Sequence, residues 1–128
     1  MTILLDTHVF LWWITNDRRI SSVAEGLISD KNNDLLLSAA SAWEIAIKAQ
    51  LGKLPLPDDP EVFIPQQMAI NRVRSLPVST DHALHVSKLP SHHRDPFDRL
   101  LIAQAKVENI PLLSDDSLIK LYPIQVLW

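Results

Sequence analysis

The 128-residue chain contains no cysteine and only two glycines. The absence of cysteine excludes disulfide bonds, thiolate-bound zinc, iron–sulfur clusters and thiol nucleophiles. It agrees with a reducing compartment, and we expect a cytoplasmic protein. No apolar run approaches the roughly 20 residues that a membrane-spanning helix needs. The first residues also lack the basic and then apolar pattern of a secretory signal. We therefore expect no membrane association.

Basic charge is scarce as well. Twelve Lys and Arg against 15 Asp and Glu give a formal net charge of −3. This balance disfavours a protein that coats nucleic acid by charge neutralisation alone. It does not exclude a nuclease, because the carboxylates of a nuclease site are neutralised by bound cations. The length and the 47% hydrophobic content predict one domain, residues 1–128, with an apolar core.

Short apolar segments alternate with helical patterns along the chain. The predicted strands are residues 2–5, 34–38, 73–76, 110–113 and 124–127. The predicted helices are residues 9–14, 22–30, 39–51, 61–71, 80–88, 96–108 and 117–121. Pro65 predicts an interruption of the fourth helix. Such alternation favours a parallel sheet covered by helices on both faces. The predicted fold is a three-layer α/β/α sandwich.

Four acidic residues are predicted to lie at one edge of this sheet. Asp6 directly follows the first strand, and Asp116 lies just after strand 110–113. Asp98 is in the first turn of the helix that leads into that strand, and Glu44 lies one turn into the helix after the second strand. Ligands of open parallel sheets bind beyond the carboxyl ends of the strands. We therefore expect the four side chains to converge.

Four converging carboxylates predict a metal site. Like charges gathered within a few ångströms repel, and each raises the pKa of its neighbours. A folded protein tolerates such a cluster mainly when a divalent cation neutralises it, and oxygen ligands favour Mg²⁺, Mn²⁺ or Ca²⁺. A carboxylate-held Mg²⁺ activates water and stabilises charge on a phosphoryl group. We assign Asp6, Glu44, Asp98 and Asp116 as metal ligands and catalytic residues, with Mg²⁺ or Mn²⁺ as the cofactor.

Two of these acids also have structural interpretations. The segment Ser41-Ala-Trp-Glu44 has the spacing of a capping box, which would make Glu44 a capping residue. Asp98 at the third position of its helix would interact with the helix dipole, with Asp95 as the N-cap. Spacing alone leaves both interpretations open.

Two neighbouring acids, Asp115 and Asp116, follow strand 110–113. Successive side chains that leave a strand point to opposite sides. One of the two is therefore expected to face the pocket, and the other to face solvent or to cap helix 117–121.

Histidines are the remaining metal-binding side chains. His82 and His85 are three residues apart on a predicted helix, but the sequence has no HExxH pattern and no cysteine, which disfavours zinc. His92, His93 and Arg94 precede Asp95 in a predicted loop. They either line the rim of the acidic cleft, where they would contact phosphate, or belong to a solvated loop.

Four segments, residues 4–8, 41–48, 92–105 and 112–116, resemble those of the PIN-domain ribonucleases, in the same order. They are most similar to the VapC-type toxins of bacterial toxin–antitoxin pairs. The third segment, His-His-Arg-Asp-Pro-Phe-Asp-Arg-Leu-Leu-Ile-Ala-Gln-Ala, is the most specific. The resemblance runs from residue 2 to about residue 122.

The resemblance implies a five-stranded parallel sheet with an acidic metal pocket and cleavage of single-stranded RNA in the cytoplasm. It also implies a homodimer and neutralisation by a small antitoxin protein. By position, Asp6, Glu44 and Asp98 match the first three acids of the family. The fourth acid of the family follows a Thr or Ser and one variable residue. That spacing, counted from Ser114, selects Asp116.

Further residues are predicted to support the four acids or to contact RNA. The predicted supporting residues are Thr7, Asp95, Ser114 and Asp115. The predicted RNA contacts are Lys48, His92, His93, Arg94 and Arg99.

Two other functions compete with a ribonuclease. A phosphatase of the haloacid-dehalogenase type needs an acid two residues after the first aspartate, and that position holds His8. A catalytically silent PIN-fold module that only binds RNA or an antitoxin would be favoured by the loss of one acid. All four acids are present, so the sequence predicts an active endoribonuclease.

Overall fold

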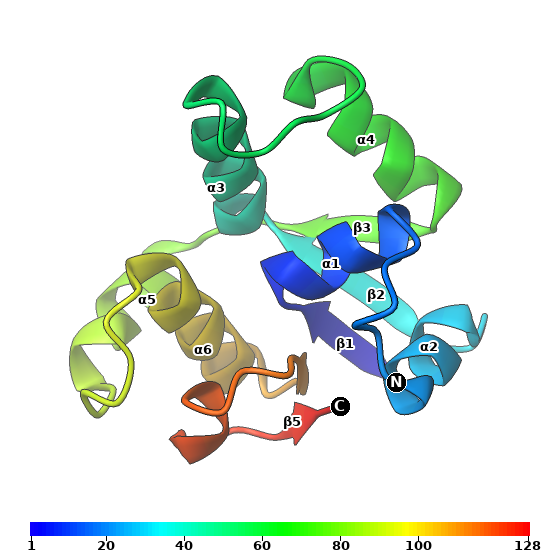
Figure 1. Ribbon diagram of the computed structural model, residues 1–128. Coiled ribbons are helices and arrows are strands. Elements are labelled where there is room, and N and C mark those ends of the chain that lie inside the picture. Colours follow the sequence, from blue (N-terminus) through cyan, green and yellow to red (C-terminus); the bar gives the residue numbers. More distant parts are fainter.

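The computed structural model describes residues 1–128 and contains a five-stranded sheet (Figure 1). The strands lie in the order β3-β2-β1-β4-β5, and every neighbouring pair is parallel. Their bounds are β1 (Thr2–Leu5), β2 (Asp34–Ser38), β3 (Val73–Leu76), β4 (Leu112–Leu113) and β5 (Val126–Leu127). The predicted parallel sheet of five strands is therefore confirmed.

Six α-helices connect these strands, with two short 3₁₀ turns. The helices are α1 (Thr7–Ile14), α2 (Ser22–Ser29), α3 (Ala39–Gln50), α4 (Pro60–Ile70), α5 (Thr80–His85) and α6 (Pro96–Glu108). The 3₁₀ turns are Val86–Lys88 and Ile119–Leu121. None of the helices is long and apolar enough to cross a membrane.

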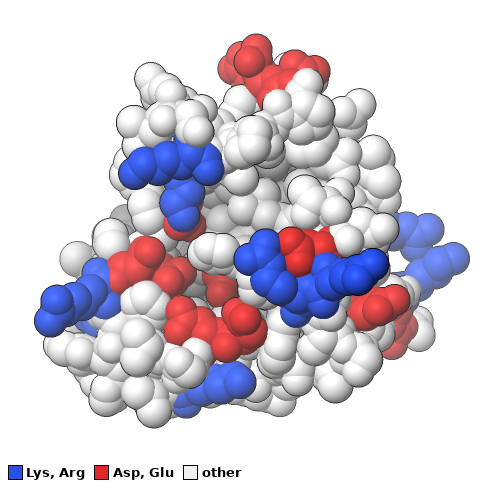
Figure 2. All heavy atoms as spheres, in the orientation of Figure 1, with Lys and Arg blue, Asp and Glu red and all other residues white.

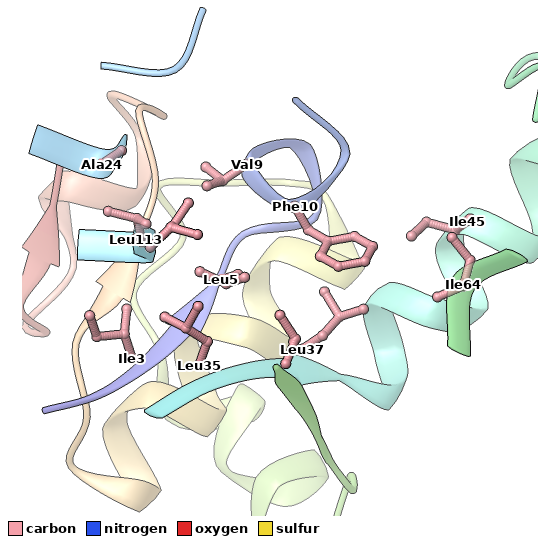
Figure 3. Close-up of a cluster of buried hydrophobic side chains, with 12 residues drawn as sticks. Ile3, Leu5, Val9, Phe10, Ala24, Leu35, Leu37, Ile45, Ile64 and Leu113 are labelled. Carbon is pink, nitrogen blue, oxygen red and sulfur yellow. The ribbon is translucent and has the colours of Figure 1, made fainter. Parts of the chain in front are cut away.

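The sheet separates two apolar cores, because successive side chains of a strand point to opposite faces. Ile3 and Leu5 of β1 pack into one core, which Figure 3 shows together with Phe10 of α1 and Ala24 of α2. Leu4 packs into the other core, which is built mainly from α6 and the C-terminal segment. Helices thus cover both faces, and the three-layer sandwich is confirmed.

The last two strands of the chain, β4 and β5, are shorter than predicted. β4 has only two residues, Leu112–Leu113, instead of residues 110–113. Pro111 has no N–H group to donate to a neighbouring strand, although its carbonyl still accepts a hydrogen bond from the Leu4 N–H group at 3.0 Å. The predicted helix 80–88 ends at His85 and continues as the 3₁₀ turn.

The predicted interruption at Pro65 is wrong. α4 runs without a break from Pro60, which occupies its first position, to Ile70. A proline in a helix removes one backbone hydrogen bond and crowds the preceding turn. Here the neighbouring Ile64 is 3% exposed and Phe63 packs against the same core. Their burial holds the helix together through the proline.

The strand order brings several segments to one edge of the sheet. β1 is the central strand, between β2 and β4, and the direction in which the chain adds strands reverses at this point. α6 leads into β4, so the beginning of α6 lies at the same edge as the ends of β1, β2 and β4 (Figure 1). Such a switch point is where open α/β sheets bind ligands.

Candidate metal centre

Acidic side chains gather at this edge of the sheet. Figure 2 shows them in a hollow near the centre of the view, with Lys and Arg side chains around it. Asp6, Glu44 and Asp98 are buried, with exposed fractions of 3%, 2% and 8%, and Asp116 is partly buried. The structure thus brings together four acids from four separate parts of the sequence.

Asp6 follows the last residue of β1 and precedes α1. Its Oδ2 atom accepts a hydrogen bond from the Ser114 hydroxyl at 2.7 Å. Its Oδ1 atom is buried and has no hydrogen-bond partner. Burial raises the pKa of Asp6, although Ser114 and the nearby His8 oppose the increase. A buried carboxylate oxygen without a partner is costly, and a bound cation would remove that cost.

Glu44 lies in the second turn of α3, and its capping-box interpretation is wrong. The N-cap of α3 is Ser38, whose hydroxyl accepts a hydrogen bond from the Ala40 N–H group at 3.0 Å. The Glu44 Oε2 atom instead accepts from the Lys48 ammonium group at 2.9 Å. The Oε1 atom is buried without a partner. Glu44 therefore offers one free oxygen, as Asp6 does.

Asp98 lies in the first turn of α6. The predicted N-cap is confirmed, because Asp95 Oδ1 accepts from the Phe97 N–H group at 2.8 Å and from the Asp98 N–H group at 3.2 Å. Burial, and then the negative charges of Asp6, Asp95 and Glu44, raise the pKa of Asp98 to about 7, while His93 opposes the increase.

Asp116 combines two roles that were expected to belong to two residues. Its Oδ1 atom accepts from the Leu118 N–H group at 2.8 Å and thereby caps the turn that follows. Its Oδ2 atom lies 2.9 Å from His93 Nε2 in the acid cluster. Asp115 is exposed, in agreement with the expectation that one of the two acids faces solvent. A single carboxylate serves both purposes because its two oxygens point in different directions.

Ser114 links two of the acids. Besides donating to Asp6, its hydroxyl oxygen accepts from the Asp116 N–H group at 3.1 Å. The buried Thr7 hydroxyl donates to the Ser41 hydroxyl at 2.8 Å and so joins the beginning of α1 to the beginning of α3. Thr7 and Ser114, two of the four predicted supporting residues, therefore lie against the elements that carry the acids.

His93 lies inside the acid cluster, although the sequence suggested only a rim position. Its Nε2 atom is 3.0 Å from Asp98 Oδ2 and 2.9 Å from Asp116 Oδ2. Its Nδ1 atom accepts from the Asp95 N–H group at 3.1 Å. In the neutral ring Nε2 therefore carries the proton and donates it toward both carboxylates. The sequence contains no signal for this placement, since it depends on how the loop folds back over α6.

The remaining predicted RNA contacts divide into two groups. Arg94 and His92 are exposed beside the cluster. The His92 and Tyr122 rings pack edge to face, with their centroids 5.2 Å apart. Arg99 instead donates to the Val86 and Pro90 carbonyl oxygens at 3.0 and 2.8 Å. The Arg99 guanidinium group thus holds the loop before α6. The N–H groups that bind these two carbonyl oxygens are therefore not free to bind RNA.

The zinc interpretation of His82 and His85 finds no support in the geometry. His82 is 3% exposed, and its Nδ1 atom accepts from the Ser79 N–H group at 3.0 Å within a capping box. Its Nε2 atom pairs with the Glu108 carboxylate at 3.0 Å. The ring nitrogens of His82 therefore have protein partners.

The acid cluster fits a divalent cation. Two buried carboxylate oxygens, one from Asp6 and one from Glu44, have no partner in the protein. One ligand atom each from His93, Asp98 and Asp116 lie within 4.8 Å of one another. A set dominated by carboxylate oxygens suits the hard ions Mg²⁺ and Mn²⁺.

The pKa of Asp98 predicts a pH dependence of folding in the metal-free protein. Because folding raises this pKa from 3.8 to about 7, the folded state binds the proton more tightly than the unfolded state. The stabilisation is complete below about pH 4 and is lost as the pH rises through about 7. The free energy of unfolding, measured by urea denaturation in EDTA, should therefore fall over this range.

In the Asp98→Asn variant the free energy of unfolding should depend less on pH than in the wild type. Asp115→Asn, which changes an exposed acid, should show the same pH dependence as the wild type. Although burial opposes the increase, the neighbouring carboxylates, chiefly that of Asp116, raise the pKa of His93, so part of the slope should persist in Asp98→Asn. If the free energy of unfolding of Asp98→Asn fell with pH as steeply as that of the wild type, the pH dependence would not originate from Asp98.

Comparisons with known proteins identify the family. The PIN domain family matches residues 3–123. Ribonuclease VapC22 from Mycobacterium tuberculosis is 33% identical over 116 residues, which cover 90% of this chain and 87% of that protein. Ribonuclease VapC16 from the same organism is 49% identical over 57 residues, which cover 44% of this chain and only 39% of that protein.

The fold agrees with these matches. A chain in the crystal structure of VapBC2 from Rickettsia felis, bound to a DNA fragment from their promoter, superimposes with a TM-score of 0.71. The alignment covers 99% of this chain and 98% of that chain at 16% identity. From the family match and the similarity to VapC22 over most of both chains, we conclude that the chain belongs to the PIN-domain family and, within it, to the VapC ribonuclease toxins.

Proposed function

We propose that this VapC-family protein is a metal-dependent endoribonuclease that hydrolyses phosphodiester bonds in single-stranded RNA. The observation that carries the proposal is the pair of buried carboxylate oxygens, Asp6 Oδ1 and Glu44 Oε1, that no protein group satisfies. They belong to a cluster in which burial and then the acidic neighbours raise the pKa of Asp98. The names of both mycobacterial relatives describe ribonucleases, which supports the choice of substrate.

The four acids Asp6, Glu44, Asp98 and Asp116 would hold Mg²⁺ or Mn²⁺. Such an ion, when bound, lowers the pKa of water and neutralises charge on a phosphoryl group. The protein contributes the alignment of the acids. Ser114 binds one oxygen of Asp6 and leaves the other free.

Three other residues orient the carboxylates. Lys48 holds Oε2 of Glu44 at 2.9 Å, so that Oε1 remains available. Asp95 caps α6 and thereby positions Asp98 in its first turn. His93 donates toward Asp98 and Asp116 and reduces their repulsion before a cation binds.

The exposed charges around the cluster suit a polyanionic substrate. Arg94 is exposed, and the side chain of Lys48 is 41% exposed even though it pairs with Glu44. Phosphate contacts from such side chains position a nucleic acid without reading its sequence. We propose that Lys48, His92 and Arg94 contact the RNA backbone, and that Arg99 has a structural role instead.

The biological role follows from the family. We propose that the chain is the toxin of a toxin–antitoxin pair and that a small cognate antitoxin protein neutralises it in the cytoplasm. The structural neighbour from Rickettsia felis comes from a VapBC assembly, which supports this partner. We also propose that residues 1–128 form one nuclease domain and that the protein acts as a homodimer.

The most direct test is RNA cleavage by the wild type and by Asp6→Asn. With Mn²⁺ and a generic RNA, the wild type should produce fragments, and EDTA should abolish them. Asp6→Asn should lose cleavage, because the substitution removes a charged ligand. Its melting temperature without metal should be unchanged or slightly higher, because one source of repulsion is removed.

Glu108→Gln is a suitable control, since this acid pairs with His82 outside the cluster. Full cleavage by Asp6→Asn would contradict the assignment of Asp6. A wild type that binds RNA but does not cut it with Mg²⁺ or Mn²⁺ would instead favour the catalytically silent module.

A second test compares Asp115 with Asp116. Asp115→Ala should keep most of the activity and stability, because its side chain is exposed. Asp116→Asn should retain the cap on the Leu118 N–H group, since asparagine also serves as an N-cap, yet it should lose cleavage by orders of magnitude. Asp116→Ala should in addition lose about 1 kcal/mol of stability with the cap.

Cleavage rates and urea denaturation on the same preparations measure both effects. If Asp115→Ala were inactive and Asp116→Asn active, the fourth ligand would be Asp115. Equal loss from both would require a site of five acids.

A further inference from the structure

One pair of aromatic side chains stands out on the surface of the molecule. Trp43 of α3 is 63% exposed, and the half-buried Phe97 of α6 meets it edge to face. Their ring centroids are 5.4 Å apart, with an angle of 72° between the planes. The Trp43 ring is therefore held by one aromatic neighbour, while most of its surface remains in contact with solvent.

The two residues of this aromatic pair are chain neighbours of two of the four acids. Trp43 precedes Glu44, and Phe97 precedes Asp98. Consecutive Cα atoms are about 3.8 Å apart, so each ring is attached next to a residue that carries one of the four acids. The two helices that hold the acids thus also hold the two rings.

We infer that Trp43 and Phe97 form a platform on which a base of the RNA strand stacks next to the scissile phosphate. The inference rests on the proposed ribonuclease function, because the acid cluster then fixes where one phosphate lies. The nucleotides on either side of that phosphate must pass over the residues around the cluster. An exposed indole ring at this position offers a flat apolar surface to the neighbouring base.

The surroundings favour a nucleic acid as the occupant. Lys48 lies one turn from Glu44 on the same helix, and Arg94 precedes α6. Exposed cations beside exposed aromatic rings are the combination that binds single-stranded nucleic acids, because the cations attract phosphates and the rings stack on bases. Stacking tolerates every base, so the platform would contribute affinity and orientation rather than sequence specificity.

The test measures RNA binding in an Asp6→Asn background, so that the probe is not cut. The probes are a single-stranded RNA oligonucleotide of mixed sequence and an oligonucleotide of the same length that is abasic at every position. Trp43→Ala should raise the Kd for the intact RNA roughly 10-fold to 100-fold, the range typical of one lost stacking contact. Trp43→Phe should recover most of the affinity, since it restores an aromatic ring.

Two controls separate stacking from other effects. For the abasic probe, the parent and Trp43→Ala should bind with similar Kd values, because phosphates alone cannot stack. Ile70→Ala should not alter RNA binding. Ile70 is 67% exposed but ends the helix before β3, and so lies near the opposite edge of the sheet. Because Trp43 is exposed, Trp43→Ala should melt within a few degrees of the parent.

Three results would overturn the inference. Trp43→Ala could bind the intact RNA as tightly as the parent, or it could weaken both probes equally. It could also leave RNA binding unchanged but alter the oligomeric state measured by light scattering, which would assign the rings to a second copy of the chain. In each case the wild type would still cut RNA. Absence of cleavage by the wild type would instead overturn the proposed function.

Discussion

The repulsion among buried carboxylates is the constraint on which the rest of this structure depends. Asp6, Glu44 and Asp98 are buried within one small region, and their mutual repulsion contributes to the high pKa of Asp98. The fold holds them there through partial compensation from a hydroxyl, an ammonium group and an imidazole, on Ser114, Lys48 and His93. Ser114 and Lys48 each bind one carboxylate oxygen, and His93 contacts one oxygen each of Asp98 and Asp116, so that other oxygens remain free. The incomplete compensation leaves room for a cation.

The sheet determines where the acidic residues lie, and the helices orient their side chains. β1 ends at Leu5, directly before Asp6, in the middle of the sheet, and β2 and β4 end on either side of it. α3 and α6 begin at the same edge (Figure 1) and carry Glu44 and Asp98, together with the exposed Trp43 and the half-buried Phe97. Two helices therefore connect the proposed chemistry with the proposed contact to a base, and a shift of either helix would alter both.

The sequence predicted the sheet and the convergence of the acids, because apolar strands and their carboxyl ends follow from local patterns. It could not decide whether Glu44 is a cap, since the spacing of Ser41 and Glu44 fits a capping box equally well, and only the N-cap at Ser38 excludes it. The prediction for Pro65 was wrong for a related reason. The burial of Ile64 in the core outweighs the local tendency of a proline to interrupt a helix. The place of His93 depends on a loop that Arg99 anchors from another element, which no local pattern encodes.

The central claim is that the free oxygens of Asp6 and Glu44 belong to a cation site. Calorimetric titration of Mn²⁺ into the metal-free protein tests it most directly, without relying on activity. The account predicts saturable binding to the wild type and to Glu108→Gln, and a loss of affinity of at least roughly tenfold in Glu44→Gln, since even residues behind the ligands have effects of that size. Equal affinity of Glu44→Gln and the wild type, or no binding to either, would contradict it.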